Sequence, residues 1–227
     1  MRVKHIDELR FSCANPKEYK GHFTIQALDT DGNVLDTYED NNLIVNTARH
    51  TMASLIAGKK AQVGITEFLL GTRGHDEIND NILVPKQVGQ DGYDESREML
   101  FSEEQKSPFW YSVSWDIDNL VDEFDNPVTF DQTQVQFLAK GQKKNQTGNE
   151  ATAENGRIPV QIELNATSVI YTFEIPELYA NGNDGQSVVG YTEAALKCGG
   201  VLFSIKCFPA KIKEAGTKFK IMWKIIF

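Results

Sequence analysis

In the last eleven residues, Thr217 to Phe227, every second residue from Phe219 onward is apolar, and Lys218, Lys220 and Lys224 lie on the other face. A period of two is typical of a β-strand with one buried face. Each large apolar side chain contributes about 1.5–3 kcal/mol when it is fully buried, so this end is predicted to be a strand of the core. The apolar members are Phe219, Ile221, Trp223, Ile225 and Phe227.

Similar alternation recurs along the chain. Phe109 to Ile117 places Tyr111, Val113 and Trp115 on one face and Trp110 on the other. Two strand-like runs, 22–28 and 34–38, flank a Gly-containing turn at 29–33 and predict a hairpin. Further strands are expected at 65–70, 128–139, 158–164, 169–175 and 201–208. We therefore predict a mainly β fold, an antiparallel, jelly-roll-like β-sandwich with one short α-helix and long loops.

The predicted helix runs from Asn46 to Gly58. Asn46 is a favourable N-cap, Ala48, Met52 and Leu55 recur on one face, and Gly58 is a typical C-terminal stop. We expect this face to pack on a sheet at an edge or one end of the fold. His50 lies on the other side of the helix and is interpreted as a surface residue rather than a metal ligand.

Length favours a single domain spanning 1–227, because strand-rich folds of this size commonly form one core. Two polar excursions interrupt it, at 72–107 and 140–157. The second contains no large apolar side chain. Because long insertions in a domain often serve function, both segments are predicted to contact partners, and 72–107 is a candidate partner-binding arm.

The net charge of −9 and the pI near 5.0 argue against a general nucleic-acid or anionic-membrane surface. A basic cluster near the C-terminus is interpreted as a solvated strand face whose charges discourage edge pairing. Residues 1–30 lack an apolar core of signal-peptide length, and three cysteines without CxxC spacing fit synthesis in a reducing cytoplasm. The clustered lysines are Lys206, Lys211, Lys213, Lys218, Lys220 and Lys224.

Catalytic chemistry is not indicated. The sequence has no Gly-rich phosphate loop, no nucleophile elbow and no metal-spaced His/Cys cluster, and its acidic residues are explained by solvated loops. Counting a calcium-binding loop from Asp29 places Val34 and Asp40 where glycine and glutamate are needed, so a turn is favoured there. We predict no enzyme activity, no cofactor, no metal site and no catalytic residue.

Three segments resemble a class of bacteriophage virion proteins found in tails, baseplates, collars and fibre bases. Asn42 to Arg49, followed by Gly58 and Leu70-Gly71-Thr72, is similar to their N-x-I-V-N-x-(A/G)-R … L-x-x-G … L-G-T run. Tyr191 to Leu196 is similar to their E-A-G-L segment, with Ala195 in place of glycine. Phe208 to Lys213 and the W-K-I-I-F ending resemble their closing pair of strands.

This resemblance implies a structural component of a phage particle, most consistent with the tail, baseplate or neck. Such a protein is made in the host bacterial cytoplasm, resides in the virion and acts by contact with other virion proteins and with copies of itself, as in a homo-oligomeric ring. The alternative is a carbohydrate-binding β-sandwich module that recognises a host receptor. Its candidate sugar-stacking aromatics are Trp110, Tyr93 and Tyr179.

Overall fold

The predicted C-terminal strand lies inside the sheet, hydrogen-bonded on both sides. The computed structural model describes residues 20–56, 64–78, 82–105, 107, 109–130, 133–145, 156–182 and 188–227. The strands are β1 (Lys20–Leu28), β2 (Val34–Ile44), β3 (Ile65–Gly71), β4 (His75–Ile78), β5 (Ile82–Pro85), β6 (Phe109–Ser114), β7 (Gln134–Asn145), β8 (Gly156–Asn165), β9 (Ser168–Ile175), β10 (Val189–Cys198), β11 (Val201–Lys213) and β12 (Lys218–Ile226); the helices are α1 (Asn46–Ile56) and α2 (Phe101–Glu104).

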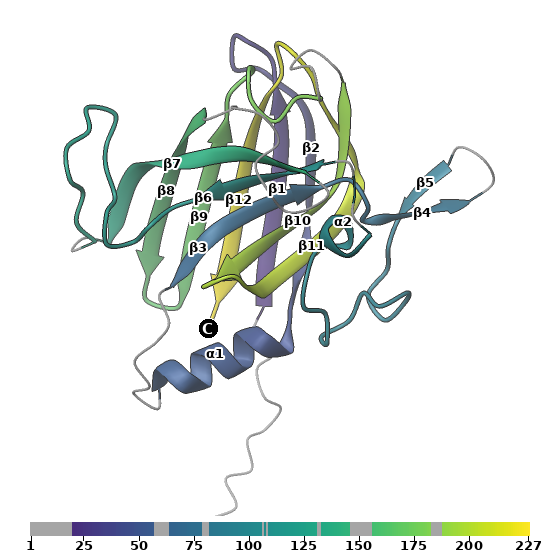
Figure 1. The fold of residues 1–227 in the computed structure, drawn as a ribbon, viewed down its shortest axis with the longest axis horizontal. Coiled ribbons are helices and arrows are strands. Elements are labelled where there is room, and N and C mark those ends of the chain that lie inside the picture. The colour runs from purple at the N-terminus through teal and green to yellow at the C-terminus, as the bar shows by residue number, and fades with distance from the viewer. Residues whose placement is uncertain are drawn as a thin grey trace, which may run out of the picture.

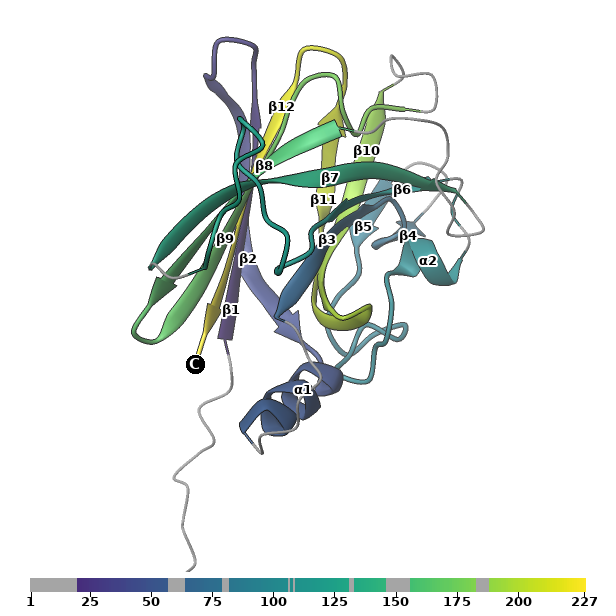
Figure 2. The ribbon, with the colours of Figure 1, turned by 60° about the vertical axis from the view of Figure 1, so that its left-hand side comes forward.

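Ten strands close into an antiparallel barrel in the order β1-β12-β9-β8-β7-β6-β3-β10-β11-β2, and β4 pairs with β5 in a separate small sheet (Figures 1 and 2). The β-sandwich prediction is therefore wrong, although the mainly β composition is correct. Sandwiches and barrels both use strands with one buried face, so alternation does not distinguish them. Pairing between distant strands, β1 with β12 and β2 with β11, decides the architecture.

Apolar side chains from all around the barrel fill its interior. Phe23 packs edge-on against Trp223 with ring centroids 4.9 Å apart, and Phe68 stacks on Phe173 at 4.3 Å. These offset and edge-on arrangements are the favourable ones for aromatic pairs. The core is therefore built from residues far apart in the sequence.

The alternation predicted for the C-terminal strand is confirmed, since Phe219, Ile221, Trp223 and Ile225 are buried. Phe227 is an exception. It lies beyond β12, its side chain is 55% exposed, and its backbone N–H donates to the Thr167 carbonyl at 2.9 Å. The expectation of an exposed edge at this strand is also wrong, because β12 pairs with β1 and β9 along its length.

Helix α1 starts at Asn46 as predicted and lies at one end of the barrel (Figure 1). Ala48 is buried in the barrel core and Met52 packs against it, whereas His50 is exposed. The apolar face of α1, with Ala48 and Met52, thus covers this end of the barrel. His50 has the surface position that was expected. Gly58, the predicted stop, lies outside the described residues.

The predicted hairpin is formed by β1 and β2, and Asp29 organises its turn. The Asp29 carboxylate accepts hydrogen bonds from the backbone N–H groups of Asp31 and Asn33, at 2.9 and 2.8 Å. Gly32 has φ +86°, a conformation that glycine adopts without strain. The aspartate therefore serves the turn, as the failed calcium spacing indicated.

The excursion predicted at 140–157 is shorter than expected. Lys140–Asn145 continue β7 and Gly156–Arg157 begin β8, with Gly141 paired to Gly156, and 146–155 lie outside the described residues. Polar composition misled the prediction, because polar residues also form strands: Lys140 and Arg157 are exposed on them, whereas Gln142 and Lys143 are buried.

Candidate interaction sites

Glu193 of β10 carries a fully buried carboxylate on the outer face of the barrel. It accepts hydrogen bonds from the backbone N–H groups of Phe101 and Ser102, both at 2.8 Å, and from the Ser102 hydroxyl at 2.5 Å. The Arg73 N–H lies 3.3 Å away. Burial raises the pKa of this carboxyl, while these donors act in the opposite direction. Glu193 thus fixes two loop segments to the barrel wall.

Gly71, at the end of β3, makes room for this carboxylate. A Cβ added there would lie 2.5 Å from the Ser102 hydroxyl oxygen and closer still to the nearer oxygen of Glu193. The L-G-T and E-A-A-L segments are paired neighbours, with Gly71 opposite Glu193. Ala195, which stands in place of the glycine of the resembling segment, is a buried residue within β10, and no turn follows Glu193.

The segment Tyr93–Gln105 covers β3, β10 and β11 and forms a second apolar cluster with them. Ion pairs at its margin join Lys197 to Glu103 at 2.5 Å and Arg97 to Glu104 at 2.6 Å. This part of the 72–107 excursion is therefore folded on its own barrel, and its contact with partners stays a prediction. The short helix α2 lies within it and begins at Phe101.

The remaining part of that excursion is the β4–β5 hairpin, which projects from the barrel at the right of Figure 1. Leu83 is 44% exposed on it. Lys86, just after β5, is buried and forms an ion pair with Asp76 of β4. The hairpin base is thereby fixed, while part of its apolar surface faces solvent.

Two of the three aromatics predicted to bind sugar are buried. Trp110 is 6% exposed and Tyr93 1% exposed, both in the outer cluster, and the Tyr93 hydroxyl accepts a hydrogen bond from the Cys207 N–H at 3.1 Å. Tyr179 is half-buried and packs against the barrel core and Gly156. The alternation around Trp110 was correct, but the neighbouring segment covers its outer face.

The C-terminal lysine cluster is largely not a solvated face. Lys206, Lys211 and Lys213 are buried. Lys213 Nζ donates to Asn181 Oδ1 at 3.0 Å and to the Glu177 carbonyl at 3.1 Å. The earlier interpretation is therefore wrong for these three residues, which are structural.

Lys206 and Lys211 belong to a junction that we name the β2–β11 seam, formed with Asp36, Tyr38 and Asp40 of β2. Backbone pairing between β2 and β11 is confined to two positions, at Leu43 and Ile44. Beyond them, Lys206 pairs with Asp40 and Lys211 with Asp36, each at 2.6 Å. Along much of the contact between β2 and β11, side-chain ion pairs thus take the place of backbone hydrogen bonds.

The seam residues of β2 point inward. Asp36, Tyr38 and Asp40 lie opposite Ala27, Ile25 and Phe23, whose side chains are in the core. The Tyr38 ring lies 5.7 and 5.8 Å from the two lysine Nζ atoms, within cation–π range. Partial burial raises the pKa of Asp40, but hydrogen bonds from Lys206 and from the Asn41 N–H outweigh it, and the pKa is lowered.

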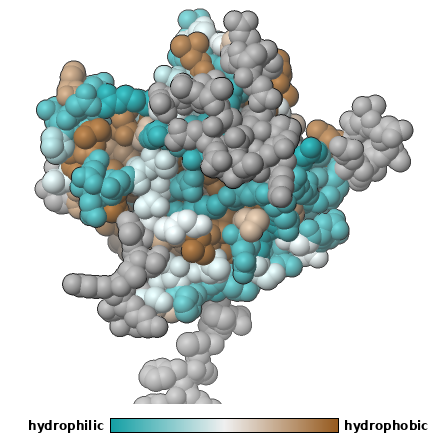
Figure 3. All heavy atoms as spheres, viewed as in Figure 1, coloured by the Kyte–Doolittle hydropathy of each residue, from teal (hydrophilic) through white to brown (hydrophobic). Residues whose placement is uncertain are grey.

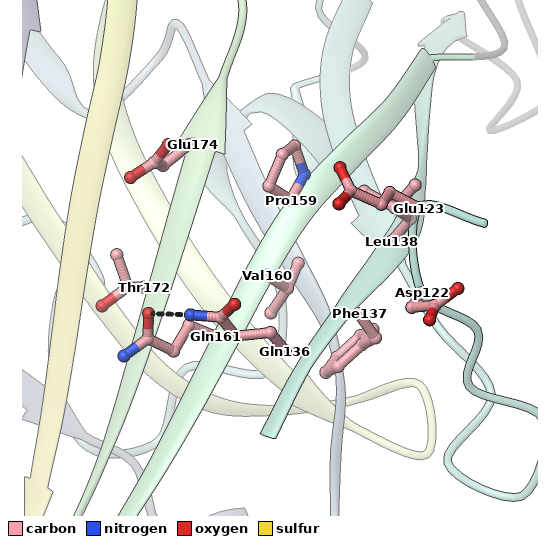
Figure 4. A pocket seen from close by; sticks show the side chains of 10 residues that line it. All are labelled: Asp122, Glu123, Gln136, Phe137, Leu138, Pro159, Val160, Gln161, Thr172 and Glu174. Carbon is pink, nitrogen blue, oxygen red and sulfur yellow. Dashed lines mark hydrogen bonds between the residues drawn. The ribbon is translucent and has the colours of Figure 1, made fainter. Parts of the chain in front are cut away.

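A groove of about 290 Å³ lies on the outer face of β7, β8 and β9 (Figure 4). Gln136, Gln161 and Thr172 form one row across the three strands. The turn at 120–128, which we call the lip, borders the groove and is joined to β7 by a hydrogen bond from the Leu138 N–H to the Val121 carbonyl at 2.8 Å. The lining residues are Asp122, Glu123, Gln136, Phe137, Leu138, Pro159, Val160, Gln161, Thr172 and Glu174.

Sequence reasoning identified neither Glu193 as an anchor nor the groove. Alternation in β7 and β8 placed Gln136 and Gln161 on an outer face, but polar outer positions are common in any strand. Glu193 stood out only within a resembling segment, and its partners are about a hundred residues away in the chain. Neither feature has a local signal.

Within the described ranges, no group of three or more His, Cys, Asp or Glu side chains is arranged to hold a metal ion. A search of the same residues for a helix able to span a membrane gives none. Cys198 and Cys207 are buried, and burial raises the pKa of both thiols. Cys13 lies outside the described residues.

Comparison of the chain with family models, with curated proteins and with solved structures returns no match. Function is therefore inferred below from residues and geometry.

Proposed function

We propose that the protein is a structural component of a bacteriophage particle, in the tail, baseplate or neck, and that it acts by protein–protein assembly. The observation that carries the proposal is the contact among the segments that resemble virion proteins. The second and third segments meet where β10 pairs with β11, with Tyr191 opposite Lys211. Gly71 and Glu193 meet where β3 and β10 pair.

These segments are far apart in the sequence, and each is a short pattern of apolar residues and turns. If the segments resembled virion proteins only by coincidence, there would be no reason for them to lie next to one another in the fold. Here most of them lie in the neighbouring strands β3, β10, β11 and β2, and β1 separates the W-K-I-I-F ending in β12 from β2. The resemblance therefore concerns one connected framework, which supports a shared architecture more strongly than any segment alone.

Assembly, on this proposal, uses surfaces outside that framework. Several large apolar side chains are exposed on separate turns, among them Phe124 at 75% and Leu178 at 73%. Figure 3 shows apolar residues gathered among polar ones on the side where Figure 1 draws β7 and β8. In a symmetric ring each interface can be modest, because many contacts engage together.

The direct test is an immunoblot of density-purified particles from a lysate of the source, with antibody raised to this chain. A 25.5 kDa band in stoichiometric amount is expected. A chain abundant in the soluble lysate but missing from purified particles would overturn the proposal. Tail-less particles from the same gradient serve as a control that assigns the band to tail or head.

A shortened β7–β8 connection tests the role of copies and neighbours. Replacing residues 146–155 by a flexible Gly-Ser linker of about six residues can span from Asn145 to Gly156, which pairs with Gly141, and so leaves the strands themselves in place. We expect unchanged thermal unfolding and reduced incorporation into particles. A large loss of thermal stability would show that this connection serves folding instead.

A further inference from the structure

The groove on β7, β8 and β9 has an apolar floor between two carboxylates. Pro159 and Leu138 line the floor, and Figure 4 shows Glu174 on one side of Pro159 and Glu123 on the other. Glu174 comes from β9 and Glu123 from the lip, so the two acids are held by different elements. A small ligand ring lying on Pro159 would have a carboxylate hydrogen-bond acceptor at each edge, Glu174 on one side and Glu123 on the other.

The polar groups of the groove retain hydrogen-bonding capacity. Gln136 Nε2 donates to Gln161 Oε1 at 3.0 Å, which orients both amides (Figure 4). Among the described residues, no side-chain hydrogen bond to Glu123 or to the Thr172 hydroxyl is recorded. Carboxylates accept up to four hydrogen bonds, and a hydroxyl both donates and accepts. The groove is thus rich in acceptors for a ligand that carries several O–H donors.

The lip that supplies Glu123 is preorganised. The Asp122 carboxylate accepts from the backbone N–H groups of Phe124 and Asn126, at 2.8 and 2.9 Å, and from the Asn126 amide at 3.0 Å. These bonds, led by the one from the Asn126 side chain, lower the pKa of Asp122. An ion pair between Asp125 and Arg157 fixes the turn to β8. Little conformational freedom would be lost on binding here.

The same turn presents an aromatic ring. Phe124 follows Glu123 directly and is 75% exposed. Ligand sites commonly combine apolar and aromatic surface with a few oriented polar groups. The lip therefore exposes an apolar ring next to Glu123 in the chain, although Phe124 itself does not line the groove.

We propose that this groove binds a neutral saccharide of one or two sugar rings. A sugar ring presents an apolar C–H face, suited to Pro159 and Leu138, and a rim of hydroxyl donors, suited to Glu123, Glu174 and the glutamine pair. No lysine or arginine lines the groove, although Lys220 Nζ lies 3.5 Å from Glu174 Oε1, so anionic sugars and phosphates meet Glu123 without a compensating charge. The volume is at the lower end of the range of about 300–1,000 Å³ for ligand pockets, which fits a small ligand.

The test is titration of the folded, full-length chain with maltose, lactose, mannobiose and chitobiose, followed by two-dimensional NMR. We expect at least one disaccharide to bind with a Kd on the order of 1 mM, and sialyllactose to bind at least about tenfold more weakly than lactose. The variant Glu123→Gln/Glu174→Gln should weaken binding about tenfold or more. Glu39→Gln, which neutralises an exposed carboxylate on β2, is the matched control and should leave the Kd within about twofold.

The spectrum of each variant reports whether the barrel remains folded, and Thr172→Val provides a second, milder probe of the same groove. Absence of binding by all four disaccharides at about 10 mM would overturn the proposal. So would binding that both groove variants leave unchanged. Binding of a Lys-Ala-Lys peptide without any sugar would overturn it in favour of a basic peptide site. None of these outcomes depends on whether the chain is part of a particle.

Discussion

The two sides of β11 are closed in different ways. On one side β11 pairs with β10 from Val201 to Lys213, and the segment Tyr93–Gln105 covers the outer face of that pairing. On the other side β11 meets β2 through two backbone-paired positions and then through the ion pairs of the β2–β11 seam. Strand β11 is thus held by backbone hydrogen bonds on the β10 side and mainly by side-chain ion pairs on the β2 side.

The comparison shows where the barrel is strong. Backbone ladders with apolar cover exclude water from every bond, whereas the seam carboxylates remain half-exposed: Asp40 at 50% and Asp36 at 54% of their side-chain surface. Exposed ion pairs contribute only about 0–1 kcal/mol each, because water competes for both charges. We therefore expect the β10 side to govern stability and the seam to be the line along which the barrel opens first.

The largest effect is expected from Glu193→Ala. Removing the carboxylate leaves the buried N–H groups of Phe101, Ser102 and Arg73 without this acceptor, and each unsatisfied buried donor costs about 1–3 kcal/mol. We predict a loss of about 3 kcal/mol in the free energy of unfolding by urea, with faster hydrogen exchange in residues 93–105. Glu193→Gln, which keeps one acceptor oxygen, should lose less. A loss below about 1 kcal/mol would contradict the anchoring role.

The next effect is expected from Gly71→Ala on the same side. The added methyl group overlaps Glu193 and Ser102, so the carboxylate must move away from its donors. Overpacking of this kind costs about 1–3 kcal/mol, measured by urea unfolding. Gly200→Ala is a control without overlap, and its cost should come only from the positive φ of +83°. If Glu193→Ala abolished the penalty of Gly71→Ala, the two effects would share one cause.

A smaller effect is expected at the seam from Lys211→Met. The substitution keeps most of the buried aliphatic chain and removes the ion pair with Asp36, so the loss should be about 0.5–1 kcal/mol. Because salt screens half-exposed charges, the difference from the wild type should shrink in about 1 M NaCl. The loss caused by Glu193→Ala should not change with salt. Equal salt sensitivity of both variants would remove the distinction between the two sides.

The smallest effect concerns pH. The pKa of Asp40 is lowered from its usual 3.8, so its ion pair stabilises the folded chain above the unfolded-state pKa and loses that contribution as pH falls through the folded-state pKa. Between about pH 6 and pH 3, the wild type should therefore lose slightly more stability than Asp40→Asn. Denaturant unfolding at each pH measures the difference. Parallel pH profiles would show that the seam pair contributes nothing.

Much of the local structure was predictable. The alternation of β12 and of β6, the β1–β2 turn at Asp29 and the start of α1 at Asn46 follow from short-range rules, and the structure confirms them. Barrel closure was not predictable, because it depends on pairing β2 with β11. The burial of Trp110 was not predictable from its own strand either, since its cover comes from a separate loop.

The predictions about interaction sites depended on which side chains are exposed to solvent. The sequence alone is a poor guide to that exposure. Lysines such as Lys213 were assigned to solvent by their charge, yet its ammonium group meets Asn181 and a backbone carbonyl inside the fold. The groove residues on the outer face are polar positions in the sequence, but nothing in the sequence distinguishes them from other polar strand residues. In both cases the deciding neighbours lie on other strands.

The position of β12 between β1 and β9 has a consequence for biosynthesis. β1 pairs with a strand that the ribosome makes only after all the other strands of the barrel. At roughly 5–20 residues per second, the edge of β1 that faces β12 stays unpaired for on the order of ten seconds or more. Pairing between strands so far apart in the sequence is also slow. Until β12 emerges, that edge is open to chaperones and to unwanted strand pairing.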